Sequence, residues 1–353
     1  MPINIDGSKG IRQNTTEVTK IPVGTTAQRT ANPEAGMIRF NTDEGYVEWY
    51  DDASDLWYPT SEFVGVVATG GTVAEITQDG IIYRVHTFTS SGTFEVIRDG
   101  KVECLIVAGG GGGGNSRGGG GGAGGLILRP DLLVQKGNYA ITVGEGGLHV
   151  PDANPGTDGG NSSFEGLLVA VGGGGGGAVS GSDDPSIYNG RPGGSGGGGR
   201  RSQDVDTEGG LGTQPTQEGN SGDPFGFGND GAGSTADTDN ATGGGGAGGP
   251  GIEGEERDPI KIGGPGLNEV TINAETYNFN KMFGSVGDLV EGESFFASGG
   301  AGQGGLSRPG GGGEGNDAGN FPGKPNTGGG GGGSRTSGGT DGGSGIVIVR
   351  YRI

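Results

Sequence analysis

The sequence predicts a mainly β and irregular fold: small N-terminal β modules, then a glycine-rich domain of packed polyglycine helices of the polyproline II type, closed by β-strands. Three observations predict it. Glycine supplies 92 of the 353 residues, far above its usual share of about 7%. Short apolar pieces lead directly into glycine runs, as at residues 105–109. No segment combines a sustained 3.6-residue apolar period with helix caps, so we expect almost no α-helix.

Composition divides the chain into four segments. Residues 1–20 are polar and lack periodicity, which favours an arm that docks onto another component. Residues 21–64 hold both tryptophans and predict a small three-stranded β module, with strands at 36–40, 46–50 and 56–58. Residues 65–108 predict a β-meander with a hairpin signal at Asp99-Gly100, leading into the glycine-rich domain at 109–353.

The glycine runs are the central feature of that last segment. A lone glycine run is usually a flexible linker. These runs have similar lengths and follow apolar strands, which favours ordered structure. Ordering costs roughly 1–2 kcal/mol per residue, and glycine has no side chain to offset it. A helix of the polyproline II type turns every three residues and points its backbone N–H and C=O groups outward, so neighbouring rods can bond one another. The main runs are 109–114, 118–122, 172–177, 196–199, 243–246, 310–313 and 328–333.

Charge and composition exclude several partners. The net charge of −20 repels nucleic acid and anionic membrane surfaces. No apolar stretch approaches the ~20 residues of a spanning helix, so we expect no membrane insertion. The single cysteine, Cys104, lies in an apolar strand-like run and is expected to be a buried thiol. The N-terminus shows no signal-peptide pattern, which indicates synthesis in the cytoplasm.

No motif indicates catalysis. Gly323-Lys324 has the wrong spacing for a phosphate-binding loop. His86 and His149 have no partner at metal-ligand spacing, and Cys104 has no local histidine. We therefore expect no enzyme activity, no catalytic residue, no metal and no cofactor. Oxygen ligation of calcium at Asp237, Asp239 and Asn240 stays a minor alternative.

Two stretches carry a family resemblance. Residues 21–59, from IPVGTTAQ to DLWYP, resemble a short module of structural proteins of tailed bacteriophages, notably fibres. The pieces HTFTSSGTFEV, VECLIVAGGGGGG, ITVGEGG, NSSFEGLLVAVGGGGGG and GGSGIVIVRY resemble the glycine-rich domain of phage tail fibres and adhesins. The long glycine-poor insert at 252–298 departs from that pattern.

The resemblance implies a non-enzymatic subunit of the virion used in host attachment. Residues 1–20 would be the virion-docking arm, in contact with other tail proteins. Loops of the glycine-rich domain would recognise a bacterial surface glycan or an outer-membrane protein. The alternative is a virion decoration or structural fibre protein without specific receptor binding.

The module at 21–64 is too small to bury its tryptophans alone. Fibres commonly solve this with threefold symmetry, so we expect a homotrimer.

Aromatic residues among the polar loops are the receptor-binding candidates, because rigid rings give large contact areas. The alternative is that they fill small local cores. We expect strands at 102–108 and 346–351 to pair and close the domain. Connections between rods then alternate between that end and the far end, where loops meet the host. The candidates, with two polar neighbours, are Tyr188, Phe225, Phe227, Phe321, Arg191 and Asp223.

Overall fold

The computed structural model describes residues 21–53, 55–60, 65–151, 154–178, 185–202, 204–214, 225–236, 240–253, 262–315, 321–335 and 338–353. The chain divides into two compact units, Met1–Val64 and Gly65–Ile353. Each unit is described by itself below.

The described part of the first unit is a four-stranded sheet. β2 (Ile38–Asn41), β3 (Tyr46–Asp51) and β4 (Leu56–Pro59) are antiparallel neighbours, close to the expected positions. The structure adds a fourth strand to the three that were predicted. This strand, β1 (Val23–Gly24), pairs parallel to β2. Two residues are too few to show an alternating pattern, so no sequence signal marks this strand. A 3-10 turn, η1 (Thr26–Gln28), follows β1.

The second unit begins as two sheets packed face to face. Their shared core contains side chains from both sheets, such as Phe94, Cys104, Phe164 and Val349. One sheet has the order β14 (Gly226–Phe227), β10 (Leu126–Val134), β9 (Gly100–Val107), β19 (Ile346–Arg352), β7 (Ile81–Phe88) and β6 (Thr72–Gln78). The other has the order β13 (Leu168–Ala170), β12 (Ser162–Phe164), β11 (Gly137–Thr142), β8 (Gly92–Arg98) and β5 (Val67–Thr69).

The β-meander expected over 65–108 is wrong. β7, β8 and β9 are consecutive in the chain, but β8 belongs to one sheet and β7 and β9 to the other. Asp99-Gly100 therefore crosses between sheets and forms no hairpin. The physical reason lies in β9, whose two faces are both apolar: Cys104 and Ile106 enter one core, and Leu105 and Val107 enter a second. A strand buried on both faces takes a central place and finds its partners, β10 and β19, far along the chain.

The predicted closure of the domain is confirmed. β19 pairs antiparallel with β9, so that Ile346 lies opposite Val107 and Arg350 opposite Glu103. The thiol of Cys104 is fully buried in this sheet, as expected.

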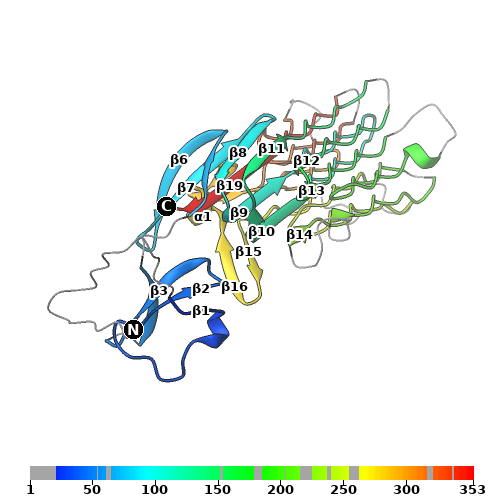
Figure 1. Ribbon diagram of the computed structural model, residues 1–353. Coiled ribbons are helices and arrows are strands. Elements are labelled where there is room, and N and C mark those ends of the chain that lie inside the picture. Colours follow the sequence, from blue (N-terminus) through cyan, green and yellow to red (C-terminus); the bar gives the residue numbers. More distant parts are fainter. Residues whose placement is uncertain are drawn as a thin grey trace, which may run out of the picture. The chain divides into compact units, whose positions relative to one another are not determined.

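The glycine runs form straight rods that leave the sheets in one direction (Figure 1). In rod 108–115, each successive residue donates its N–H to a different neighbour, with a period of three. Gly111 and Gly114 donate to Gly122 and Gly119, at 2.8 and 2.9 Å. Gly110 and Gly113 donate to another rod, at 338–345. Gly109 and Gly112 donate to a further rod, at 154–161. This is the threefold backbone expected for polyglycine helices.

The innermost rod, 117–125, bonds to rods on all of its sides. Gly121 donates to the oxygen of Gly331 and accepts from the N–H of Gly300. A Cβ atom on Gly121 would lie 2.1 Å from the oxygen of Gly111, so only glycine fits. The rods that exchange hydrogen bonds with it are 108–115, 171–178, 195–201, 241–247, 297–303 and 328–334.

The glycine-poor insert packs against the sheets. Its described part contains two hairpins and the short helix α1 (Phe279–Phe283). Phe279, Phe283 and Phe296 join Leu105 and Leu126 in the second core. Over the described ranges, no helix is long and apolar enough to cross a membrane. The hairpins are β15 (Glu269–Ile272) with β16 (Glu275–Asn278), and β17 (Asp288–Val290) with β18 (Glu293–Phe295).

Candidate functional site

The rods have two ends. One end joins the strands, where Ala108 bonds to Gly125 and Gly345 to Gly144. The other, which we call the distal end, contains residues 115–117, 200–202 and 334–335. At about 3.1 Å per residue, rod 108–115 places these residues about 22 Å beyond the strands. Figure 1 shows the rods running toward the short green helix η2 (Pro185–Ile187).

Backbone hydrogen bonds tie several rod ends together at the distal end. The N–H of Arg201 donates to the oxygen of Arg117 at 2.8 Å, and the N–H of Arg117 donates to the oxygen of Arg335 at 3.3 Å. Three segments far apart in sequence therefore present arginines side by side. This gathering was missed at the sequence level. Its signal is that each of these arginines follows a glycine run that leads away from the strands.

Tyr188 also lies at the distal end. The N–H of Arg200 donates to the oxygen of Tyr188 at 2.9 Å, and the guanidinium carbon lies 3.7 Å from the centre of the ring. The Arg200 residue is only 8% exposed. Burial lowers the pKa of its guanidinium, and Arg117 acts in the same direction, against the opposing effect of Tyr188 and Asp204. Stacking on the ring holds this buried cation in place.

Phe321 and Arg191 lie along the rods. Phe321 is 47% exposed, and its backbone carbonyl accepts a hydrogen bond from Thr340 Oγ1, beside Gly113. Arg191 forms an ion pair with Asp158 at 2.8 Å, and its N–H donates to Gly175. Both side chains are therefore on the surface of the bundle.

Phe225 and Phe227 lie at the strand end, so the expected distal position is wrong for them. Phe227 pairs opposite Leu126, and both phenylalanines pack against the second core. Arg129 stacks over the Phe225 ring at 4.4 Å. The Phe-Gly-Phe pattern is that of a short edge strand with both aromatics on one face. Asp223 lies outside the described residues.

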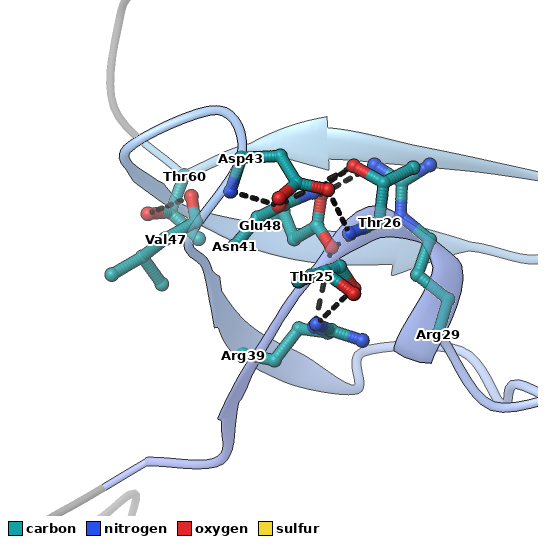
Figure 2. A network of polar contacts seen from close by, with 9 residues as sticks. All are labelled: Thr25, Thr26, Arg29, Arg39, Asn41, Asp43, Val47, Glu48 and Thr60. Carbon is teal, nitrogen blue, oxygen red and sulfur yellow. Dashed lines mark hydrogen bonds and ion pairs between the residues drawn. The ribbon is translucent and has the colours of Figure 1, made fainter.

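One face of the sheet in the first unit holds a network of polar contacts. Figure 2 shows the polar face, where the buried carboxylate of Glu48 bonds to Arg29 Nη2 at 2.6 Å and to Asn41 Nδ2 at 3.1 Å, with Arg39 Nε at 3.4 Å. Burial alone would raise the pKa of Glu48, but the Arg29 and Asn41 hydrogen bonds and the two arginine charges outweigh it and lower that pKa. Arg29 and Asn41 therefore hold Glu48 by hydrogen bonds, whereas Arg39 Nε acts on it through charge alone.

The other face of this sheet is mostly apolar. Trp49 lies opposite both Ile38 and Tyr58, and the Trp49 and Tyr58 rings are 5.8 Å apart. A contiguous apolar face on so small a unit is typical of an association surface. Its exposed members are Val23, Ile38, Trp49, Leu56 and Tyr58.

Among the residues that the structure describes, no group of three or more His, Cys, Asp or Glu is placed to hold a metal. Asp237 and Asp239 lie outside those residues. His86 is buried, with Nδ1 2.7 Å from the oxygen of Gly70 and Nε2 3.1 Å from the Tyr351 hydroxyl. Burial raises the pKa of the Cys104 thiol, which keeps it protonated and unreactive.

A family model described as a glycine-rich domain matches residues 89–352. The match begins in the turn before β8 and ends in β19, so it contains the described rods and most of both sheets. No curated protein matches the sequence.

Proposed function

The chain belongs to the glycine-rich domain family, and from this premise we propose that it is a non-enzymatic tail-fibre or adhesin subunit of a tailed bacteriophage. In this proposal the protein attaches to the virion by its N-terminal part and recognises the bacterial surface through loops of the glycine-rich domain. The observation that supports it best is the bundle itself, a rigid scaffold whose rods carry loops at an end remote from the strands.

The energetics of the bundle favour this use. Rod 117–125 takes its hydrogen bonds from neighbouring rods, so its order does not depend on the loops that join rods at the distal end. Loops on such a scaffold are free to change, which suits recognition of variable host surfaces. Tyr188 and Phe321 are the candidate contacts that the structure leaves on the outer part of the bundle.

The N-terminal part would supply attachment and assembly. Residues 1–20 would be the docking arm for other tail proteins. The apolar face of the first unit would pack against further copies of the chain in a homotrimer. The exposed members of that face are all uncharged, so copies of a chain of net charge −20 can meet there with little repulsion.

Competition for adsorption tests the proposal. Purified chain, added to the bacterial host before the virus, is expected to reduce phage adsorption. Tyr188→Ala and Phe321→Ala should weaken this competition, whereas Leu211→Ala, at an exposed apolar residue near the strand end, should not. A chain that is present on virions but neither binds host cells nor competes would instead support the decoration or structural fibre.

Two obvious variants are unsuited to this test. Deleting 252–298 would remove Phe279 and Phe296 from the second core, so the variant would lose stability whatever its role in binding. Alanine at Phe225 or Phe227 would also remove a side chain that packs against the second core, so the variant would lose stability as well. Substitutions at the distal end leave both cores intact.

A further inference from the structure

Four arginines meet at the distal end: Arg117, Arg200, Arg201 and Arg335, which we call the distal arginine cluster. The chain has 22 Lys and Arg against 42 Asp and Glu, so such a gathering runs against its composition. Direct backbone hydrogen bonds link Arg117 to both Arg201 and Arg335. Arg117 lies close enough to Arg200 for the two charges to repel each other, and an anion bound between them would relieve the repulsion.

Buried polar atoms at the cluster lack partners. Arg200 is 8% exposed, yet its Nε makes no hydrogen bond to any described residue, and the bond from its Nη1 to the oxygen of Arg201 is long at 3.4 Å. The hydroxyl of Ser334, next to Arg335, is also buried and unbonded in the part of the chain that the structure describes. Unmet donors on a buried guanidinium are costly in the free protein and available to a ligand.

The backbone at Arg117 supports a role for its side chain. Ser116 and Arg117 have φ values of 51° and 63°, in the left-handed region. Glycine is the default residue there, and this chain places glycine on both sides of the turn. Strained non-glycine residues of this kind cluster at functional sites. The Arg117 side chain is exposed and forms no ion pair with any described residue.

We propose that the distal arginine cluster binds the phosphate or carboxylate groups of an acidic glycan on the host surface. Guanidinium groups match both oxyanions with paired, charge-assisted hydrogen bonds. Bacterial surfaces are anionic and repel a chain of net charge −20. That repulsion is screened beyond about 10 Å, so at contact distance the arginines next to the ligand act on it most strongly. The inference rests on the proposed function and names the chemical class of its receptor.

Binding of the full chain to defined polyanions tests it. Alginate presents carboxylates, inorganic polyphosphate presents phosphates, and dextran is the neutral control. The parent chain is expected to bind one or both polyanions but not dextran, and to release them between about 0.1 M and about 1 M salt. If the chain binds alginate more tightly, the cluster recognises carboxylates; if it binds polyphosphate more tightly, the cluster recognises phosphates.

Charge-removing variants locate the site. Arg117→Gly and Arg335→Gln should each weaken binding at least about tenfold, as for loss of a hydrogen bond to a charged group. Arg84→Gln, which removes the same charge from the sheet, should bind as the parent does. Arg117→Gly also relieves the left-handed strain, so its melting temperature should be equal or higher, which separates lost binding from lost folding.

Two outcomes overturn the inference. One is a parent chain that binds neither polyanion, or dextran equally well; the other is cluster variants that bind like the parent. If the parent still adsorbs to host cells in either case, the proposed adhesin stands and only its acidic receptor is wrong. A parent that binds polyanions through the cluster but never adsorbs to the host would refute the adhesin instead.

Discussion

At the scale of single residues, absent side chains set the spacing of the bundle. A Cβ atom on Gly174 would lie 1.9 Å from the oxygen of Arg191 and 2.7 Å from its carbonyl carbon. Both atoms are backbone, so no rotamer change can relieve the clash. Gly338 differs, since a Cβ there has nothing within 4 Å.

Gly174→Val should therefore lower the free energy of unfolding by about 3 kcal/mol or more, the upper range for an overpacked core. Gly338→Ala, the matched control, should change it by less than about 0.5 kcal/mol. Denaturant unfolding of the two variants and the parent measures both. An unchanged midpoint of denaturant unfolding for Gly174→Val would contradict the packing of the rods.

His86 is expected to make the stability of the second unit depend on pH. Burial lowers the pKa of its imidazole, against the opposing hydrogen bond to Gly70. The unfolded chain takes up a proton near the ordinary pKa of about 6.5, and the folded chain resists it. Stability should therefore fall as the pH drops below that value.

Melting temperatures at pH 7.5 and pH 5.5 check this expectation. The parent is expected to lose more stability over that interval than His86→Gln, which has no imidazole to protonate. Equal losses in the two proteins would show that His86 does not cause the dependence.

At the scale of elements, the buried Glu48 carboxylate joins η1 to the sheet of the first unit. Its partners Arg29 and Arg39 come from different segments, beside η1 and in β2. Removing one partner of a buried ionic network leaves the others uncompensated. The sheet alone, without this network, would be near the lower limit of stability.

Glu48→Gln should therefore destabilise the first unit by about 3 kcal/mol. Trp49 and Trp57 are the only tryptophans, so tryptophan fluorescence reports the unfolding of this unit alone. Glu44→Gln, at an exposed carboxylate in the neighbouring turn, is the control. A fluorescence transition at the same denaturant concentration in both variants would contradict the role of the network.

The elements also show how far sequence reasoning reaches. Strands β2, β3 and β4 follow from short apolar and aromatic segments separated by turn residues, and β19 follows from its continuous apolar run. The rods follow because ordered glycine needs backbone hydrogen-bond partners. The pairing of β9 with β19 was predicted, but its pairing with β10 was not. Both faces of β9 are apolar, so alternation does not show which strand lies on its other side. Phe225 and Phe227 were misplaced since an isolated aromatic among polar residues is equally compatible with a loop tip and an edge strand. The distal arginine cluster depends on rod direction, which only the three-dimensional arrangement supplies.

At the scale of the whole molecule, the apolar face of the first unit predicts assembly. Light scattering on the purified chain is expected to give the mass of three chains of 34.8 kDa each. Trp49→Lys places a charge in the centre of that face and should yield monomers. Val205→Lys, at an exposed apolar residue of the second unit, should remain trimeric. A monomeric parent at micromolar concentration would refute this assembly.

The central claim is that the glycine runs are ordered by hydrogen bonds between rods. Hydrogen exchange of the amides at 117–125 tests it most directly, since each of these amides from Arg117 to Gly125 donates to a backbone oxygen outside its own rod. Exchange should require opening of the whole second unit and proceed as slowly as that of the core strand β9. Exchange at the rate of an unstructured glycine peptide, while β9 stays protected, would show that the runs are flexible linkers and would contradict the account.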